Sequence, residues 1–189
     1  MRITYSTEWE LYRMNVAAET RKRFLSLGRS LTRWPDLRAW ALCGLIGIGV
    51  AATVSVAGFV SGILKWQPVA GNLPLLFLSV LMVPAFTEEL FFRGLLVPDR
   101  DETQRPMIVI AGGLVMFVLW HIAEAKLFLP GATLFLKPAF LLCAGLIGLG
   151  CALLRYCTGS LWPAVVFHAG LVWAWKAYLG GPSLADLMG

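Results

Sequence analysis

Long apolar stretches alternate with short polar linkers along most of the chain. Five of them can be read as membrane spans, with approximate bounds Ala39 to Leu64, Leu73 to Val97, Pro106 to Leu129, Leu134 to Leu154 and Leu161 to Leu179. A helix needs about 20 apolar residues to cross the hydrocarbon core of a bilayer. The pattern therefore predicts an all-α fold, a polytopic transmembrane helical bundle of about five spans.

The first 38 residues follow a different pattern. They hold half of the Lys and Arg residues, and their apolar side chains recur at helical spacing, at Trp9, Tyr12, Val16, Phe24, Leu27 and Leu31. Such a segment is typical of a basic amphipathic helix on a membrane surface. We expect residues 1–38 to form this helix and residues 39–189 to form one transmembrane domain.

Composition supports a membrane protein and excludes an ordinary soluble domain. The 189 residues are 58% hydrophobic and 14% charged, with a mean hydropathy of +0.73, which is far from the average of soluble domains. We expect the lipid bilayer and a membrane-associated protein or peptide as partners, and no nucleic acid. The sequence leaves the oligomeric state open.

The positive charges predict the orientation. With five spans, twelve Lys and Arg residues fall on the side of the N-terminus, against Lys65, Lys126, Lys137 and Lys176 on the other side. Positive loops stay in the cytoplasm, so the N-terminus is predicted to be cytoplasmic. The short chain favours a bacterial source, and hence the bacterial cytoplasmic (inner) membrane.

Apart from lysines within three residues of a span end, few charged or histidine residues interrupt the predicted spans: Glu88, Glu89, Arg93, His121, Glu124 and His168. A charge at the bilayer centre costs at least about 2.5 to 3.5 kcal/mol, so each needs a partner or a function. Glu89 and Arg93 are four residues apart in the favourable acid-first order, which predicts a structural ion pair. Glu88 has no local cation and is free to act as a base on water.

Both histidines of the chain lie in predicted spans. Either one alone can be a hydrogen-bonded packing residue. Together with Glu88, however, His121 and His168 form a set from three helices that can activate a water molecule and stabilise an oxyanion. That chemistry suffices for peptide hydrolysis without a nucleophilic side chain.

Three short motifs carry a resemblance to a known family. They are Glu88-Glu89-Leu90-Phe91-Phe92-Arg93 (E-E-x-x-x-R), Phe117 to His121 (F-x-x-x-H), and His168 as the start of H-x-x-x-N/D. In this order on three spans they resemble the CAAX-protease and bacteriocin-processing (CPBP or Abi) membrane proteases, a family of glutamic intramembrane endopeptidases. The resemblance covers about residues 73–175, which correspond to the family's four-helix core.

The resemblance implies a role for each motif residue. Glu88 would deprotonate water with help from His121, while His168 would stabilise the oxyanion and Glu89, Arg93 and Phe117 would support them. The chain departs from the family pattern at Val172, which stands where the family has Asn or Asp and cannot donate a hydrogen bond. Losing one oxyanion donor typically costs about 10²- to 10³-fold in rate, and Trp173, Trp175 and Lys176 are candidate replacements.

Several alternatives remain open at this point. Glu124 lies three residues after His121 on the same helix face, where it either orients the imidazole or marks the outer membrane surface beside Lys126. No cofactor is predicted, but both histidines and a glutamate are also a plausible set for Zn²⁺. A non-catalytic scaffold or immunity-type protein is the alternative to a peptidase, and a small transporter is a weaker one.

The predicted depth of each side chain in the membrane tests whether Glu88, His121 and His168 can form one site. At ~1.5 Å per residue from the predicted cytoplasmic ends, Glu88 and His168 lie at similar depths, whereas His121 lies ~8 to 10 Å deeper. A tilted helix must close this gap if the three act together.

Overall fold

The computed structural model describes residues 4–100 and 102–189, and this part of the chain is mainly helical. In chain order the elements are α1 (Thr4–Thr32), α2 (Leu37–Val60), α3 (Leu73–Val80), η1 (Leu81–Phe86), α4 (Thr87–Glu89), η2 (Leu90–Leu95), α5 (Pro106–Ala123), η3 (Glu124–Phe128), η4 (Thr133–Leu136), α6 (Pro138–Thr158), α7 (Trp162–Tyr178) and α8 (Leu184–Met188). The segments α3 to η2 form one kinked helix, called the kinked span below. Segment η3 continues α5.

Polar and glycine residues set where the long helices begin and end. The side chains of Asp36 and Asn72 cap α2 and α3 by accepting hydrogen bonds from the backbone N–H of Ala39 (2.7 Å) and Leu75 (3.0 Å). Gly159 ends α6 in the left-handed region, with φ 68°.

Four helices of the described chain are long and apolar enough to cross a membrane: Leu37–Val60, Leu73–Leu95, Pro106–Phe128 and Pro138–Thr158. The prediction of an all-α membrane protein is confirmed to this extent. Helix α7 has 17 residues, or about 25 Å at 1.5 Å per residue, against a hydrocarbon core of about 30 Å. The count of five spans depends on α7 and stays a prediction.

Three predicted boundaries were wrong by about one helical turn, one of them being the end of α6, which lies at Thr158 rather than at Leu154. The span expected at Leu134 begins at Pro138, because Thr133–Leu136 form a separate 3₁₀ turn before it. The first span ends at Val60 rather than Leu64, because the chain turns at Gly62, which has φ 72°.

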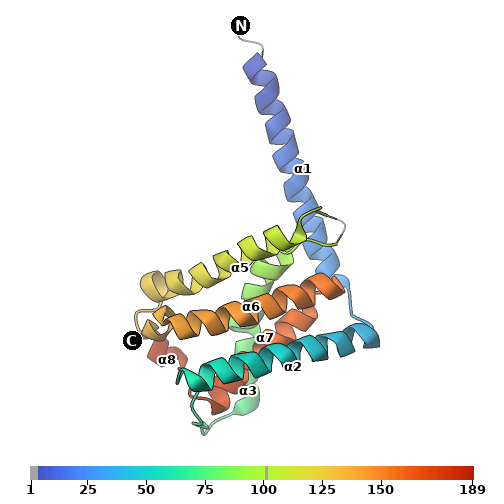
Figure 1. The fold of residues 1–189 in the computed structure, drawn as a ribbon. Coiled ribbons are helices and arrows are strands. Elements are labelled where there is room, and N and C mark those ends of the chain that lie inside the picture. The colour runs from blue at the N-terminus through green and yellow to red at the C-terminus, as the bar shows by residue number, and fades with distance from the viewer. Residues whose placement is uncertain (1–3, 101) are drawn as a thin grey trace.

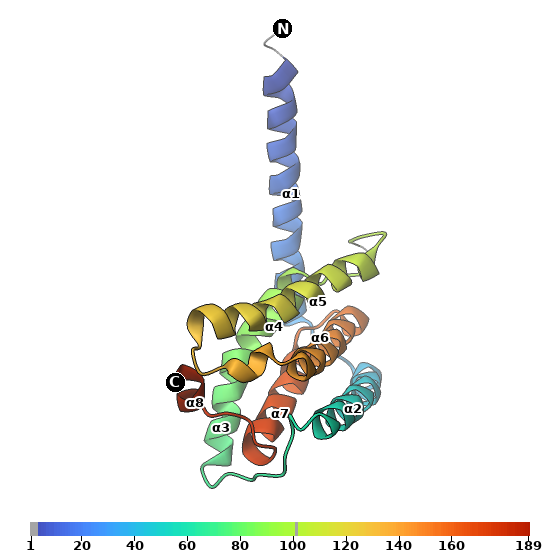
Figure 2. The same cartoon turned by 60° about the vertical axis from the view of Figure 1, so that its left-hand side comes forward.

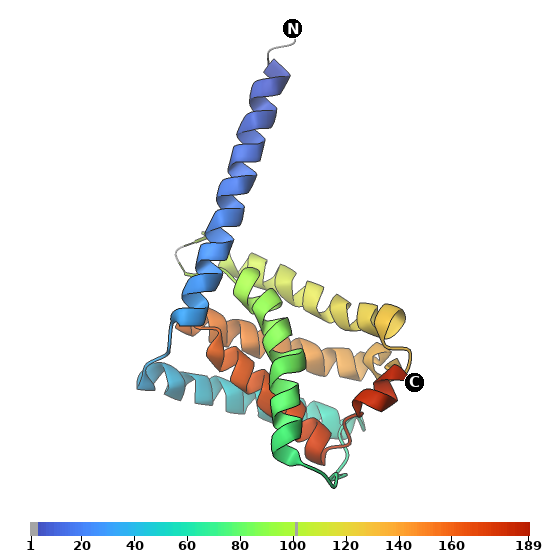
Figure 3. The same cartoon turned by 180° about the vertical axis from the view of Figure 1, so that it is seen from behind.

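The long helices form a layer that the kinked span crosses. Helix α6 packs between α2 and α5, and α7 packs on α6 and on the kinked span. Figure 1 shows α2, α6 and α5 running side by side, and Figure 3 shows the kinked span passing across them on the opposite face. Side chains from several helices therefore converge where the kinked span crosses the layer.

Helix α1 stands away from this bundle and touches it only near its C-terminal end (Figures 1 and 2). There the carbonyls of Ser30 and Leu31 accept hydrogen bonds from the Leu161 backbone N–H (3.0 Å) and the Trp162 indole (2.9 Å). Of the predicted apolar face, Leu27 and Leu31 are half-buried, and the exposed members are Trp9, Tyr12, Val16 and Phe24. That this face lies on a membrane stays a prediction.

A buried ion network fastens the base of α1. Arg155 is fully buried, and its Nη1 donates to Asp99 Oδ1 (2.8 Å), while Arg29 Nη2 donates to Asp99 Oδ2 (3.0 Å). Burial alone would raise the pKa of the Asp99 carboxyl, but the hydrogen bonds and charges of Arg155 and Arg29 hold that pKa below its ordinary value. Arg155, one of the twelve positive residues assigned above to the side of the N-terminus, is therefore an internal ion-pair partner.

Candidate active site

The kinked span carries three ionisable side chains into the bundle. Val83 has non-helical backbone angles (φ −140°, ψ 118°) and precedes Pro84, so the helix bends just before the glutamates. A π-helical turn, η2, follows α4, and such turns occur frequently at functional sites. Glu88, Glu89 and Arg93 are only 9%, 0% and 2% exposed.

Glu89 joins the kinked span to α7. Its Oε1 lies 3.2 Å from Arg93 Nη1, which is the ion pair that the spacing predicted. The same oxygen lies 2.8 Å from Nδ1 of His168. Because an ionised carboxylate only accepts, Nδ1 carries the proton and donates it to this hydrogen bond. Glu89 thus also orients the imidazole of His168, a contact that the sequence did not predict.

Phe117 contacts three of the predicted site residues. Its ring centroid lies 4.1 Å from Arg93 Cζ, 4.7 Å from the His121 ring and 6.3 Å from the His168 ring. A guanidinium over an aromatic face is attracted by the ring quadrupole. Phe117 therefore holds the charged and imidazole groups in one cluster.

Glu88 faces His121 and Glu124 on α5 and η3. One carboxylate oxygen from each glutamate and one ring nitrogen of His121 all lie within 4.8 Å of one another. The gap in depth expected from counting residues is closed because the kinked span crosses α5 instead of running beside it (Figure 3). Glu124 therefore belongs to the cluster by position, although Lys126 follows it closely.

Hydrogen bonding indicates which imidazole nitrogen is available. His121 Nδ1 lies 2.9 Å from the carbonyl oxygen of Phe117, so Nδ1–H donates and Nε2 is the acceptor of the neutral ring. His168 Nε2 lies 4.0 Å from Glu88 Oε2, an oxygen with no hydrogen-bond partner among the described residues. The cluster thus offers an unpaired carboxylate oxygen beside two imidazoles.

Two groups of side chains have the geometry to hold a metal ion. One is Glu88, His121 and Glu124, and the other is Glu89, Cys151 and His168. The zinc alternative required both histidines in one site, but they fall into different groups. Arg93 and His168 already engage Glu89, so the Glu88 group is the better candidate for a cation.

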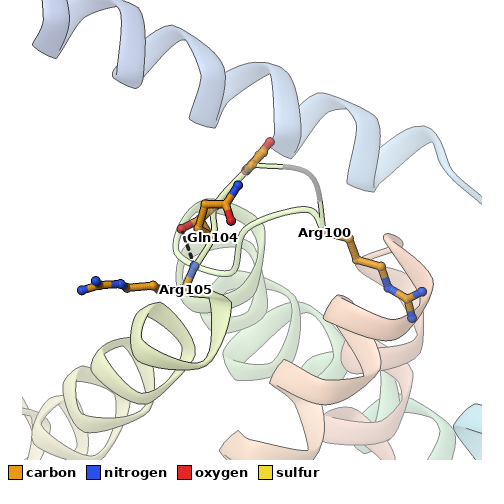
Figure 4. A pocket seen from close by; sticks show the side chains of 5 residues that line it. Arg100, Gln104 and Arg105 are labelled. Atoms are coloured by element: carbon orange, nitrogen blue, oxygen red, sulfur yellow. Dashed lines mark hydrogen bonds between the residues drawn. The ribbon is translucent and has the colours of Figure 1, made fainter.

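A hollow of ≈650 Å³ lies outside the cluster, in the loop between η2 and α5, where Arg100, Glu102, Thr103, Gln104 and Arg105 line it. Figure 4 shows that Arg100 and Arg105 point away from each other. Arg100 donates to the backbone carbonyls of Tyr156 and Cys157 at the end of α6. The hollow holds none of the predicted site residues.

Two residues near the cluster were missed as site residues. Cys151 lies beside Glu89 and His168, but a lone cysteine in an apolar stretch is typical of a small buried hydrophobic side chain. Gly148 on α6 lies against Arg93 and Phe117, where a Cβ would be 2.8 Å from Arg93 Nη2. Glycines in an apolar helix favour close packing of a neighbouring helix, but they do not identify the side chain that needs the space.

One of three comparisons with known proteins found a match. Searches of curated proteins and of solved structures found no match. A family model described as "Type II CAAX prenyl endopeptidase Rce1-like" matches residues 70–174. This range holds the kinked span, α5, α6 and most of α7, and covers more than half of the chain, in close agreement with the range of the predicted resemblance. The chain therefore belongs to the Rce1-like family of type II CAAX prenyl endopeptidases.

Proposed function

We propose that this chain is a membrane-embedded endopeptidase that hydrolyses a peptide bond of a membrane-associated substrate with water activated by Glu88. The observation that carries the proposal is the convergence of Glu88, His121 and His168 from three helices, while Glu89 is neutralised by Arg93. The family description adds a first substrate class to test, a prenylated C-terminal tail.

In the proposed reaction, Glu88 and His121 act on one water molecule. The carboxylate takes one proton of the water, and His121 Nε2 accepts a hydrogen bond from the other O–H. The hydroxide oxygen attacks the carbonyl carbon of the scissile bond. The proton on Glu88 then passes to the leaving amine, which returns the carboxylate to its starting state.

In this scheme His168 stabilises the oxyanion by donating a hydrogen bond. When its ring carries both protons, Nδ1–H donates to Glu89 and Nε2–H is available to the oxygen of the tetrahedral intermediate. A donor already oriented in a site shielded from water stabilises the developing charge strongly.

A peptide-cleavage assay with isolated membranes tests the proposed function. Membranes from cells that express the wild-type chain, Glu88→Gln or neither are incubated with a farnesylated peptide ending in a CAAX-type tail, and new peptide termini are identified by mass spectrometry. We expect new termini only with the wild-type chain. Identical termini with wild type and Glu88→Gln would instead indicate a non-catalytic scaffold.

Adding a chelator to the cleavage assay distinguishes water activation by Glu88 without a metal from metal-dependent water activation. If EDTA leaves the cleavage rate of purified wild-type protein unchanged, the metal-free scheme holds. If EDTA abolishes cleavage and Zn²⁺ restores it, the Glu88, His121 and Glu124 group binds the metal and the metal-free scheme is wrong.

A further inference from the structure

Helix α1 exposes a row of large apolar side chains. Trp9, Tyr12 and Phe24 are 61%, 59% and 61% exposed, and Val16 is 47% exposed. The rings of Trp9 and Tyr12 stack on each other, with centroids 5.6 Å apart. Exposed apolar patches are typical of surfaces that bind a protein or a membrane. These four side chains are called the apolar face of α1 below.

The apolar face points in the same direction as the part of α1 that docks on the bundle. Trp9 precedes Leu27 by 18 residues and Val16 precedes it by 11, which are about five and three full helical turns. Leu27 packs on η2, where an added Cβ on Gly94 would lie 2.5 Å from Leu27 Cδ1. The apolar face therefore continues, beyond the edge of the bundle, the side of α1 that rests on it.

The base of α1 lies where several spans begin or end. Helix α2 follows α1 after a short linker, and η2 at the end of the kinked span packs against α1. Residues at the base of α1 also bind Asp99 in the loop after η2, and Leu161 and Trp162 at the start of α7. Because these span ends lie together, the base of α1 lies at one surface of the membrane.

A tryptophan cluster indicates the depth of this end of the bundle. The ring of Trp34 lies 5.6 Å from that of Trp40 and 6.5 Å from that of Trp162, and the Trp162 indole donates to the Leu31 carbonyl of α1. Tryptophan is enriched at the level of the lipid headgroups, where one end of the side chain is apolar and the other is wet. The base of α1 is therefore at headgroup depth.

The direction of α1 determines what its apolar face meets. Figures 1 and 3 show that α1 runs across the direction of α2, α5 and α6 instead of continuing along it. Its 29 residues extend about 44 Å at 1.5 Å per residue. A helix that begins at headgroup depth and runs across the spans stays near that depth. Beside the bundle this layer is lipid, so the apolar face meets the bilayer.

The charges on α1 favour lipid over a second copy of the chain. Helix α1 carries five Lys and Arg residues against three Glu, and Arg13, Arg21 and Lys22 are exposed. Two such helices repel each other, whereas a positive surface helix is attracted to anionic headgroups. The opposite side of α1 also exposes Leu11 and Met14, but singly exposed aliphatic side chains are common on protein surfaces.

We propose that α1 lies flat in the headgroup layer of the membrane, with Trp9, Tyr12 and Val16 at the boundary with the acyl chains. The apolar face is covered by lipid of the leaflet at which α2 begins and α6 ends. Anionic headgroups pair with the exposed Arg side chains along α1. This placement is independent of whether the chain cleaves peptides.

Spin labels on opposite sides of α1 test the placement. Full-length Val16→Cys and Ala18→Cys proteins each carry one nitroxide and are reconstituted at one copy per nanodisc of phosphatidylcholine and phosphatidylglycerol. Both positions are exposed, and residues two apart on a helix point about 160° away from each other. Cys157, the free cysteine that is not buried, is replaced by Ser in both proteins. Cys157→Ser alone, treated with the label, provides the blank.

Collision rates report the surroundings of each label. Oxygen concentrates among the acyl chains, whereas a nickel chelate stays in water. We expect the ratio of oxygen to chelate collision rates to be severalfold higher at position 16 than at position 18. High chelate access at both positions would place α1 in water and overturn the proposal. High oxygen and low chelate access at both positions would immerse α1 on all sides and also overturn it.

Two further measurements examine the occupant. In nanodiscs loaded with two copies, dipolar broadening between labels at position 16, together with chelate access there in single-copy discs, would assign the apolar face to a second copy and overturn the proposal. Exchanging phosphatidylglycerol for phosphatidylcholine should lower the ratio at position 16, and an unchanged ratio would contradict the pairing with anionic headgroups. Melting temperatures of both labelled proteins should match that of Cys157→Ser, because Val16 and Ala18 are exposed.

Discussion

Adjacent glutamates in the kinked span have very different surroundings. Glu89 is fully buried and shares one oxygen between Arg93 and His168. Glu88 has an oxygen with no partner and lies close to His121. One carboxylate is therefore a fixed anion that organises its neighbours, and the other is available for chemistry in the proposed reaction.

This difference predicts opposite effects of two matched substitutions on stability. Glu89→Gln leaves Arg93 buried without its counter-charge, which should lower the free energy of unfolding by about 3–5 kcal/mol. Glu88→Gln should change it much less, because Glu88 Oε2 has no hydrogen bond to lose. Denaturant unfolding of both variants in micelles measures the difference, and equal losses would contradict the separate roles.

At the scale of elements, the packing of α6 determines how closely the cluster can assemble. Arg93 and Phe117 approach the backbone of α6 at Gly148, and a Cβ there would also lie 2.9 Å from Leu114 Cδ1. At Gly145, one helical turn earlier, an added Cβ would meet only Val118, at an ordinary 3.6 Å. The two glycines therefore form a natural comparison.

Gly148→Ala should displace Arg93 or Phe117 and destabilise the protein by about 1–3 kcal/mol, as overpacking does. Gly145→Ala should be tolerated, because its Cβ meets only ordinary van der Waals contact. Melting temperatures and cleavage rates of the two variants measure this contrast. Loss of activity in Gly145→Ala with normal activity in Gly148→Ala would refute the packing argument.

Acid should loosen the base of α1. The pKa of Asp99 is held below its ordinary value in the folded chain, so its contribution to stability is complete above the unfolded pKa of about 3.9 and is lost as pH falls through the lower folded pKa. Asp99→Asn should remove that contribution at every pH.

Hydrogen exchange of residues 24–32 as a function of pH measures the docking of α1. Wild type should lose protection only in the acid range, whereas Asp99→Asn should lack it at neutral pH. Glu19→Gln is the control, because Glu19 forms exposed pairs with Lys22 and Arg23 that contribute little. If the amides of residues 24–32 in Asp99→Asn are as protected from exchange as in wild type at neutral pH, the ion pairs of Asp99 with Arg29 and Arg155 do not anchor α1.

At the scale of the whole molecule, α1 and the bundle meet at one end. The base of α1 contacts η2, the loop at Asp99 and the start of α7, which are the segments predicted to lie on the cytoplasmic side. If α7 crosses the membrane as a fifth span, the two termini lie on opposite sides. A bundle of four spans places them on the same side.

Reporter fusions test this topology. If the N-terminus is cytoplasmic, as the excess of positive residues on its side predicts, and α7 is a fifth span, fluorescent protein at the N-terminus should fluoresce in the cytoplasm and alkaline phosphatase at the C-terminus should be active outside. An inactive phosphatase together with a fluorescent C-terminal fusion would exclude a fifth span.

The sequence predicted the spans and the ion pair because both depend on local patterns. Four spans appear as apolar stretches, and the Glu89–Arg93 pair follows from helical spacing. The contact of His168 with Glu89 could not be predicted, because it depends on how α7 packs against the kinked span. The proximity of His121 to Glu88 could not be predicted by counting residues from span ends, because such counting assumes parallel helices.

The central claim is that Glu88 activates the water that cleaves the peptide bond. The most direct measurement is the cleavage rate of purified Glu88→Gln protein per folded molecule. The wild-type rate is measured in the same way for comparison. We predict a loss of at least about 10²-fold, typical for removal of a general base, with an unchanged melting temperature. A rate within twofold of wild type would contradict the claim.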